Sequence, residues 1–276
     1  MDDIIPGVAA TIAPGIVRIT APNPSVMTGP GTNSYIVGER ELVLIDPGPD
    51  IESHAKALIE AVDGRLKWIL CTHTHLDHSP AAHALKAATG APIAGLVCPQ
   101  DGRQDAQFAP DRVLSDGDRV SVDGMTFRAI HTPGHVCNHL CYLFEERKLL
   151  FTGDHVMQGS TVVITPPNGS MRDYLSSLEK LLSVELAALA PGHGRVIETP
   201  HAELRKVIAH RLKREQKVID ALERKSPGTL DELVPLAYDD VSERLYPVAR
   251  RSLHAHLIKL VEDGRARDHG DRWALR

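Results

Sequence analysis

Aromatic residues are scarce in this chain, which has Trp 2, Tyr 5 and Phe 4 in 276 residues. Apolar runs are short as well, and none approaches the roughly 18 residues that a membrane-spanning helix needs. The first residues lack the basic segment followed by an apolar one that marks a secretory signal. We therefore expect a cytoplasmic protein with no membrane partner.

Cysteine and net charge are also low. The four cysteines, at positions 71, 98, 137 and 141, show no C-x-x-C spacing, so we interpret them as reduced thiols at buried apolar positions. The net charge is -5, and no polybasic block is present. A charged fraction of 24% and a hydrophobic fraction of 42% are ordinary for a globular protein and exclude disorder, collagen and coiled coil. The sequence carries no signal for an oligomeric state.

Strand and helix patterns alternate through the first two hundred residues. Helices are predicted at 52–62, at 80–89 with Ser79 as N-cap, and at about 171–183. Short apolar runs that end in Pro, Gly or polar residues predict strands at 35–37, 42–45, 67–71, 119–122, 126–130, 140–144, 148–152 and 186–190. This alternation predicts an α/β fold.

The character of the chain changes near residue 200. From His201 onward, 16 Lys and Arg face 13 Asp and Glu, whereas the first 200 residues hold 15 and 23. Helix patterns at 202–224, 229–237 and 247–262 precede a tail, 264–275, that could form a small hairpin. Three helices followed by a β-ribbon are the order of a winged-helix module. We therefore predict two domains, 1–200 and 201–276.

Histidines are clustered rather than scattered. The chain has 15 of them, and His73, His75 and His78 fall within six residues directly after a predicted strand. In a strand end, residues i and i+2 point the same way, so His73 and His75 could hold one ion while Asp77 and His78 turn toward a neighbouring one. Imidazole and carboxylate ligands suit zinc, and also manganese or iron.

Three more candidate ligands follow predicted strands at sharp turns. His135 and His193 each end a Pro-Gly-His tripeptide, and Asp154 follows Thr152-Gly153. Any one of these turns is weak support for a ligand. Together with the histidine cluster, they predict a metal site at one edge of a sheet.

These residues resemble the metallo-beta-lactamase superfamily, whose H-x-H-x-D-H signature is met by His73, His75, Asp77 and His78. The resemblance implies an αβ/βα sandwich and two divalent ions. It assigns His73, His75 and His135 to one ion, Asp77, His78 and His193 to the second, and Asp154 to both. Asp46, in Leu-Ile-Asp-Pro-Gly, resembles the acid that braces the histidine loop. One departure is that Ser79-Pro80 stands where many members have Gly-Gly.

Such a site implies a hydrolase. Two ions lower the pKa of a shared water toward neutrality, and the resulting hydroxide attacks an acyl carbon or a phosphorus. Asp77 could orient that hydroxide or accept its proton. The diiron electron-transfer members have an acid where this chain has His75, which disfavours a redox role. The 39 positions between Asp154 and His193 are too few for the inserted domain of polynucleotide-cleaving members.

The resemblance is closer to the beta-lactamase-like protein 2 family. It rests on Gly31-Thr-Asn-Ser-Tyr-Ile-Val-Gly38, the two Pro-Gly-His segments, His210-Arg211 through Glu215-Gln216, and Trp273. That family joins the hydrolase fold to a small winged-helix-like domain. Its animal members are known as endoribonucleases selective for single-stranded RNA, while glyoxalase II-type and polyketide thioesterases share its catalytic half.

Three functions are therefore expected as candidates. The first is a dinuclear metal hydrolase acting on single-stranded RNA, for which a positive balance of 3 over the last 76 residues is thin support. The second is the same site acting on a small-molecule thioester, ester, lactone or lactam. The third is a non-enzymatic nucleic-acid-binding protein with a structural metal. For the C-terminal domain we favour shaping the substrate cleft over binding nucleic acid.

A weaker hypothesis concerns Asn33 and Tyr35. They follow Met27-Thr28-Gly29-Pro30-Gly31, a loop of the kind that can overhang a site. We list them as candidate substrate contacts, with strand entry as the alternative.

Overall fold

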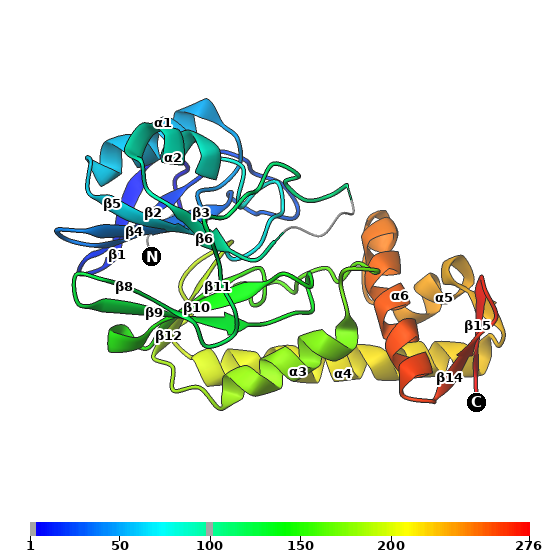
Figure 1. Cartoon of the computed structure of the whole chain (residues 1–276). Helices are drawn as coiled ribbons and strands as arrows, with labels where there is room; N and C mark the ends of the chain where they lie inside the picture. Colours follow the sequence, from blue (N-terminus) through cyan, green and yellow to red (C-terminus); the bar gives the residue numbers. More distant parts are fainter. Residues whose placement is uncertain (1–3, 98–101) are drawn as a thin grey trace. The chain divides into compact units, whose positions relative to one another are not determined.

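The computed structural model describes residues 4–97 and 102–276 (Figure 1). The chain divides into two compact units. The first unit comprises the chain up to Thr132, Asn138–Thr161 and Glu185–His201. The second comprises Pro133–Cys137, Val162–Val184 and Ala202–Arg276. Within the described residues, no helix is both long and apolar enough to cross a bilayer. The domain boundary between residues 200 and 201 stays a prediction.

The first sheet of the first unit has seven strands in the same order as in the chain. Strands β1 to β4 pair antiparallel, and β4 to β7 pair parallel. The strands expected at 35–37, 42–45 and 67–71 are confirmed as β3, β4 and β5. The bounds are β1 Ala9–Ala13, β2 Ile16–Thr20, β3 Asn33–Gly38, β4 Leu42–Ile45, β5 Leu66–Leu70, β6 Ile93–Gly95 and β7 Arg112–Val113.

Two helices, α1 (Glu52–Val62) and α2 (Ala82–Thr89), cover the outer face of this sheet (Figure 1). Leu44 and Ile69 of the sheet pack in one buried cluster with Leu58 of α1 and Leu85 of α2. The helix expected at 52–62 is confirmed. The N-cap expected for α2 is wrong, because the Ser79 hydroxyl donates to the carboxylate of Asp105 at 2.9 Å and the helix begins at Ala82.

The second sheet has the order β12-β11-β10-β9-β8, with β11 and β12 parallel and the other pairs antiparallel. The strands expected at 119–122, 126–130, 140–144 and 148–152 are all present. A short 3-10 turn, η1 (Glu145–Arg147), follows β10. The bounds are β8 Arg119–Val122, β9 Met125–His131, β10 Leu140–Phe144, β11 Leu149–Gly153 and β12 Ala188–Pro191.

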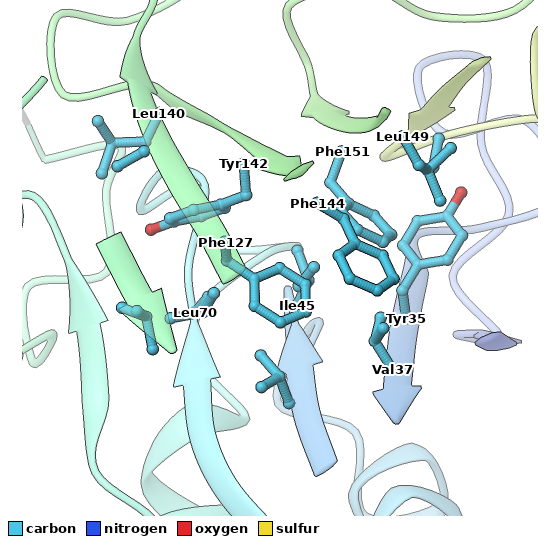
Figure 2. Packing of buried hydrophobic residues seen from close by; sticks show 14 of the residues in the cluster. Tyr35, Val37, Ile45, Leu70, Phe127, Leu140, Tyr142, Phe144, Leu149 and Phe151 are labelled. Atoms are coloured by element: carbon cyan, nitrogen blue, oxygen red, sulfur yellow. The ribbon is translucent and has the colours of Figure 1, made fainter. Parts of the chain in front are cut away.

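The core of the first unit lies between these two sheets (Figure 2). Although aromatic residues are scarce, five of them meet here: Tyr35, Phe127, Tyr142, Phe144 and Phe151. The rings of Phe127 and Phe144 stack with centroids 5.1 Å apart, and those of Tyr35 and Phe151 are 5.2 Å apart. Each such side chain contributes about 1.5–3 kcal/mol by leaving water. The aromatic residues therefore hold the two sheets together.

Four of these strands end just before predicted ligands, which places the candidate site at one end of the two sheets. The strands, with the residues that follow them, are β5 before His73, β9 before His135, β11 before Asp154 and β12 before His193.

The second unit contains the expected helical tail. Its own core gathers Leu222 of α4, Leu233 of α5, Leu253 and Leu257 of α6, and Trp273 of β15. The helices and ribbon predicted from the sequence are confirmed. The bounds are α3 Met171–Leu182, α4 Pro200–Arg224, α5 Leu230–Ala237, η2 Glu243–Leu245, α6 Tyr246–Glu262, β13 Gly228–Thr229, β14 Ala266–Asp268 and β15 Arg272–Leu275.

The cysteines follow the expectation only in part. Cys71 and Cys141 are buried in the first unit. Cys137 is exposed, because it lies in the loop between β9 and β10 rather than in a strand, so its predicted burial is wrong. Cys98 lies outside the described residues.

Phe127→Ala should destabilise the first unit by about 3–5 kcal/mol, because it empties the centre of the aromatic core. Each unit contains one tryptophan whose fluorescence can report its unfolding, because Trp68 lies in β5 and Trp273 in β15. Urea unfolding of Trp273→Phe protein, followed by Trp68 fluorescence, measures the loss. Val113→Ala, at a side chain 54% exposed, is the control. Equal midpoints for the two variants would contradict this account of the core.

Candidate metal centre

The Asp46 carboxylate binds two residues of the loop between β5 and α2. Asp46 directly follows β4, has a left-handed backbone (φ 51) and is 2% exposed. Its Oδ1 accepts the Thr72 backbone N–H at 2.7 Å, and its Oδ2 accepts the Thr72 hydroxyl at 2.8 Å. The same Oδ2 lies 2.9 Å from Nδ1 of His78. Because a carboxylate accepts, that ring donates from Nδ1 and presents Nε2 to the site, which agrees with the bracing role expected for Asp46.

Six of the seven predicted ligands come together within the first unit. Two groups have ligand atoms within 4.8 Å of one another, and His75 joins them through Nδ1, 2.9 Å from Nε2 of His73. Nε2 of His78 lies 3.3 Å from Asp154 Oδ1, and Nε2 of His193 lies 3.2 Å from the same oxygen. The two groups are His73, His78 and Asp154, and Asp77, His78 and His193.

The seventh predicted ligand, His135, belongs to the second unit. It lies in the loop between β9 and β10, within the segment Pro133–Cys137. Its Nδ1 is 2.9 Å from the carbonyl oxygen of Val163, so the ring donates from Nδ1 and Nε2 keeps the lone pair that a metal ligand needs. Its assignment as a ligand stays a prediction.

The segment that carries His193 is fixed by two buried side chains of β3. Asn33 donates from Nδ2 to the carbonyl oxygens of Pro191 at 3.0 Å and Gly194 at 2.9 Å. The Tyr35 hydroxyl donates to the same Pro191 oxygen at 2.8 Å. Asn33 is 0% exposed and Tyr35 2%, which argues against the substrate contacts expected from the sequence. Both residues instead hold the turn that delivers a ligand.

Glycine is required next to His193. A Cβ atom on Gly192 would lie 2.7 Å from Cε1 of His78 and 3.0 Å from Oδ1 of Asp154. Any side chain there would therefore push two candidate ligands apart. This close approach explains why glycine precedes His193 in the second Pro-Gly-His tripeptide.

The charges of the centre favour a cation. Burial and the neighbouring imidazoles lower the pKa of His73 well below its usual value, so the ring is neutral and can donate a lone pair. Burial lowers the pKa of His78 too, but the carboxylates around that ring outweigh this effect and raise it. Those carboxylates belong to Asp77, Asp154 and Asp46. The neutral ring of His73 and the ionised carboxylates of Asp77 and Asp154 are donors that suit a divalent ion, and such an ion would supply the positive charge that the surroundings of His78 favour.

Some supporting residues were not predicted. Thr72 binds Asp46 through both its amide and its hydroxyl, and that hydroxyl also lies 3.0 Å from Nδ1 of His73. His139 is fully buried, its ring centroid 5.1 Å from that of His73 and its Nδ1 2.9 Å from the Thr132 hydroxyl. The position of Thr72 directly before the H-x-H run could have indicated its role. No local signal marks His139.

A pocket of about 450 Å³ opens beside His193. One wall is the loop that precedes β3, where Val26 is 86% exposed and Met27 47%. Arg195 adds a basic side chain to the lining. The remaining lining residues are Ile4, Thr28, Gly29, Pro30, Met157, Gln158, Ser160 and Gly194.

The fold and the donor set define a metal-dependent hydrolase. Residues 27–193 match the metallo-beta-lactamase superfamily, and residues 229–273 match the beta-lactamase associated winged helix domain. The chain belongs to the metallo-beta-lactamase superfamily. It therefore has the α/β fold of that superfamily, which implies divalent metal ions, followed by a C-terminal winged helix domain.

Relatives extend over most of the chain. A beta-lactamase-like protein 2 homolog from Drosophila melanogaster is 30% identical, over 96% of this chain and 93% of that protein. An atrochrysone carboxyl ACP thioesterase from Aspergillus fumigatus is 33% identical, over 91% and 82%. Among solved structures, a metallo-beta-lactamase family protein from Thermus thermophilus superposes with a TM-score of 0.80 at 21% identity, over 96% of this chain and 100% of that one.

Asp46→Asn should weaken metal binding about 10- to 100-fold, because an amide would turn its NH2 group toward the donors of Thr72 and His78. Titrating apo protein with zinc against a chromophoric chelator measures this. Asp50→Asn, at an exposed residue four positions later, is the control and should bind as wild type. Wild-type affinity in the Asp46 variant would show that the carboxylate does not orient the loop.

Asn33→Ala should lower the unfolding free energy of the first unit by about 1–3 kcal/mol, because it leaves the Gly194 carbonyl without its donor. Tyr35→Phe should cost less, since Asn33 still donates to the Pro191 carbonyl. Trp68 fluorescence in urea measures both. A raised KM with unchanged stability would instead indicate the substrate contact.

Proposed function

We propose that this hydrolase uses two divalent ions, most favourably zinc, to cleave a small-molecule thioester or ester that carries an apolar acyl group. Manganese and iron suit the same donors. His135, on the loop that joins two strands of the second sheet, would complete the centre. We assign one ion to His73, His75 and His135, the other to Asp77, His78 and His193, and place Asp154 between them.

Bound there, two divalent ions would lower the pKa of a water molecule toward neutrality and stabilise the negative charge that develops on the substrate oxygen. Asp77 is the catalytic side chain of the chain itself. Its Oδ2 accepts the Thr32 hydroxyl at 3.3 Å and lies 3.3 Å from Nε2 of His193. With its side chain 29% exposed, this carboxylate can reach water and orient it or accept its proton.

The observation that favours an acyl substrate is the pocket beside His193. Its walls include Val26, Met27, Pro30 and Met157, which would bury an alkyl or aryl group next to the reacting carbonyl. Arg195 could face an anionic part of the substrate, such as a carboxylate or phosphate. The relative named as an ACP thioesterase supports the same class of substrate.

Single-stranded RNA is the competing substrate. A groove that tracks a nucleic-acid backbone needs several basic side chains interleaved with aromatic ones. The lining of this pocket contains no Phe, Tyr or Trp, and its basic side chains are those of His193 and Arg195. For the C-terminal unit, shaping the substrate cleft remains a prediction.

The test is a series of acyl thioesters, from acetyl to octanoyl, on the zinc-loaded full-length protein. We expect kcat/KM to rise about fourfold for each CH2 group that enters the pocket, since each contributes about 0.8 kcal/mol. Met27→Ser should flatten this dependence, whereas Val113→Ser, at an exposed side chain of β7, should not. Asp77→Ala should lower every rate about 100-fold or more.

RNA provides the opposing result. Wild-type protein that cuts single-stranded RNA, fails on every thioester, and loses RNA cleavage in Asp77→Ala would replace the acyl substrate with a phosphodiester. Loss of neither activity in Asp77→Ala would remove the catalytic role of that carboxylate.

A further inference from the structure

The loop that carries His135 makes backbone and hydroxyl contacts within the second unit. The Gly134 carbonyl accepts the Ser170 amide at 2.8 Å, and the Pro133 carbonyl accepts the Ser177 hydroxyl at 2.8 Å. A Cβ atom on Gly134 would lie 2.3 Å from Cα of Tyr174, so the loop sits directly against α3. These contacts place the loop against α3, and none of them involves the imidazole ring of His135.

The carbonyl oxygen of Val163 contributes to the orientation of the ring, because it accepts from His135 Nδ1 at 2.9 Å. Val163 lies in the stretch 161–170, which has neither helix nor strand. Its carbonyl direction is therefore not fixed by a ladder of backbone hydrogen bonds. A contact that fixes the peptide of Val163 would therefore help to keep the His135 ring in a single tautomer.

Arg211 of α4 contacts the peptide directly before it. Its Nη2 donates to the carbonyl oxygen of Val162, whose residue is 2% exposed. The guanidinium carbon lies 5.2 Å from the centre of the Tyr174 ring, which is 1% exposed on α3. A planar guanidinium can lie against an aromatic face and donate sideways at once, which a lysine cannot. Arg211 thus links the helix α4 to the segment that orients His135.

The position of Arg211 is costly for stability. The residue is 3% exposed, and within the described part of the chain its Nε finds no hydrogen-bond partner. Burying a charged group with an unmet donor disfavours the folded state. A purely structural role would be served better by an apolar side chain.

We propose that Arg211 is a positioning residue for His135. By fixing the Val162 peptide it aims the Val163 carbonyl at Nδ1, so that Nε2 of His135 is presented as a metal ligand. This inference rests on the proposed function, in which His135 holds one of two ions. In this arrangement helix α4, which carries Arg211, helps to support the metal centre.

Arg214 provides a matched control on the same helix. It is 7% exposed, and its guanidinium carbon lies 4.2 Å from the centre of the Tyr238 ring. Its donors bind the Ala237 carbonyl at 2.5 Å and the Asp240 carboxylate at 2.8 Å. Arg214 is therefore a buried arginine stacked on a tyrosine, like Arg211, but none of these partners belongs to the 161–170 stretch.

The experiment compares zinc binding by full-length Arg211→Met, Arg211→Lys, Arg214→Met and His135→Gln proteins, titrated from the apo form. We expect His135→Gln to lose one ion. Arg211→Met should weaken that same ion about 10- to 100-fold and leave the other unchanged, Arg211→Lys should be intermediate, and Arg214→Met should bind as wild type. Imidazole nitrogen NMR of apo protein should show the Nδ1–H tautomer of His135 in wild type and a mixture in Arg211→Met.

Each failure has a separate meaning. If His135→Gln still binds two ions with wild-type affinity, the ligand assignment in the proposed function is wrong. If His135→Gln loses an ion but both Arg211 variants bind two ions as wild type does, the positioning role is wrong. If Arg211→Met fails to fold, as judged by Trp273 fluorescence, Arg211→Lys decides by the same comparison.

Discussion

The structure depends on one constraint, which is that six ionisable side chains must stay buried or half-buried within a few ångströms of one another. Each of them loses hydration, so each needs a partner that fixes its orientation and its charge. The Asp46 carboxylate meets this need for the histidine loop, and the Gly31 carbonyl does so for His193, whose Nδ1 lies 3.2 Å away. The two sheets serve this arrangement, because they bring the ends of their strands to one place.

Much of this arrangement could be predicted from the sequence because the signals are local. A short apolar run followed by Gly or a polar residue marks a strand and its end within a few residues, so the sequence predicts β3, β4, β5, β10 and β11. The ligands follow those ends directly, as Asp154 follows Gly153. The winged-helix order in the last residues was found for the same reason, since its helices carry continuous periodic patterns.

The parts that could not be predicted depend on partners distant in the chain. Ser79 has the local pattern of an N-cap, but Asp105, 26 positions away, takes its hydroxyl. The loop before Asn33 suggests a residue beside a substrate site. In the structure the Asn33 amide donates to the carbonyl oxygens of Pro191 and Gly194, about 160 positions later in the chain. His139 belongs to no sequence motif, and only the folded chain places its ring centroid 5.1 Å from that of His73. In each case a tertiary hydrogen bond or contact overrides a short-range expectation.

The grouping of Pro133–Cys137 with Val162–Val184 and Ala202–Arg276 has a consequence for biosynthesis. A chain leaves the ribosome from its N-terminus, and domains generally fold as units in that order. The loop carrying His135 is synthesised early, yet α3 and α4, which support it, emerge only later. Because α4 emerges only after β12 and His193, the two sheets can form, and six candidate ligands can assemble, before Arg211 is available to orient His135. A chain truncated before α4 would therefore be expected to bind the ion at His135 more weakly than the full-length chain.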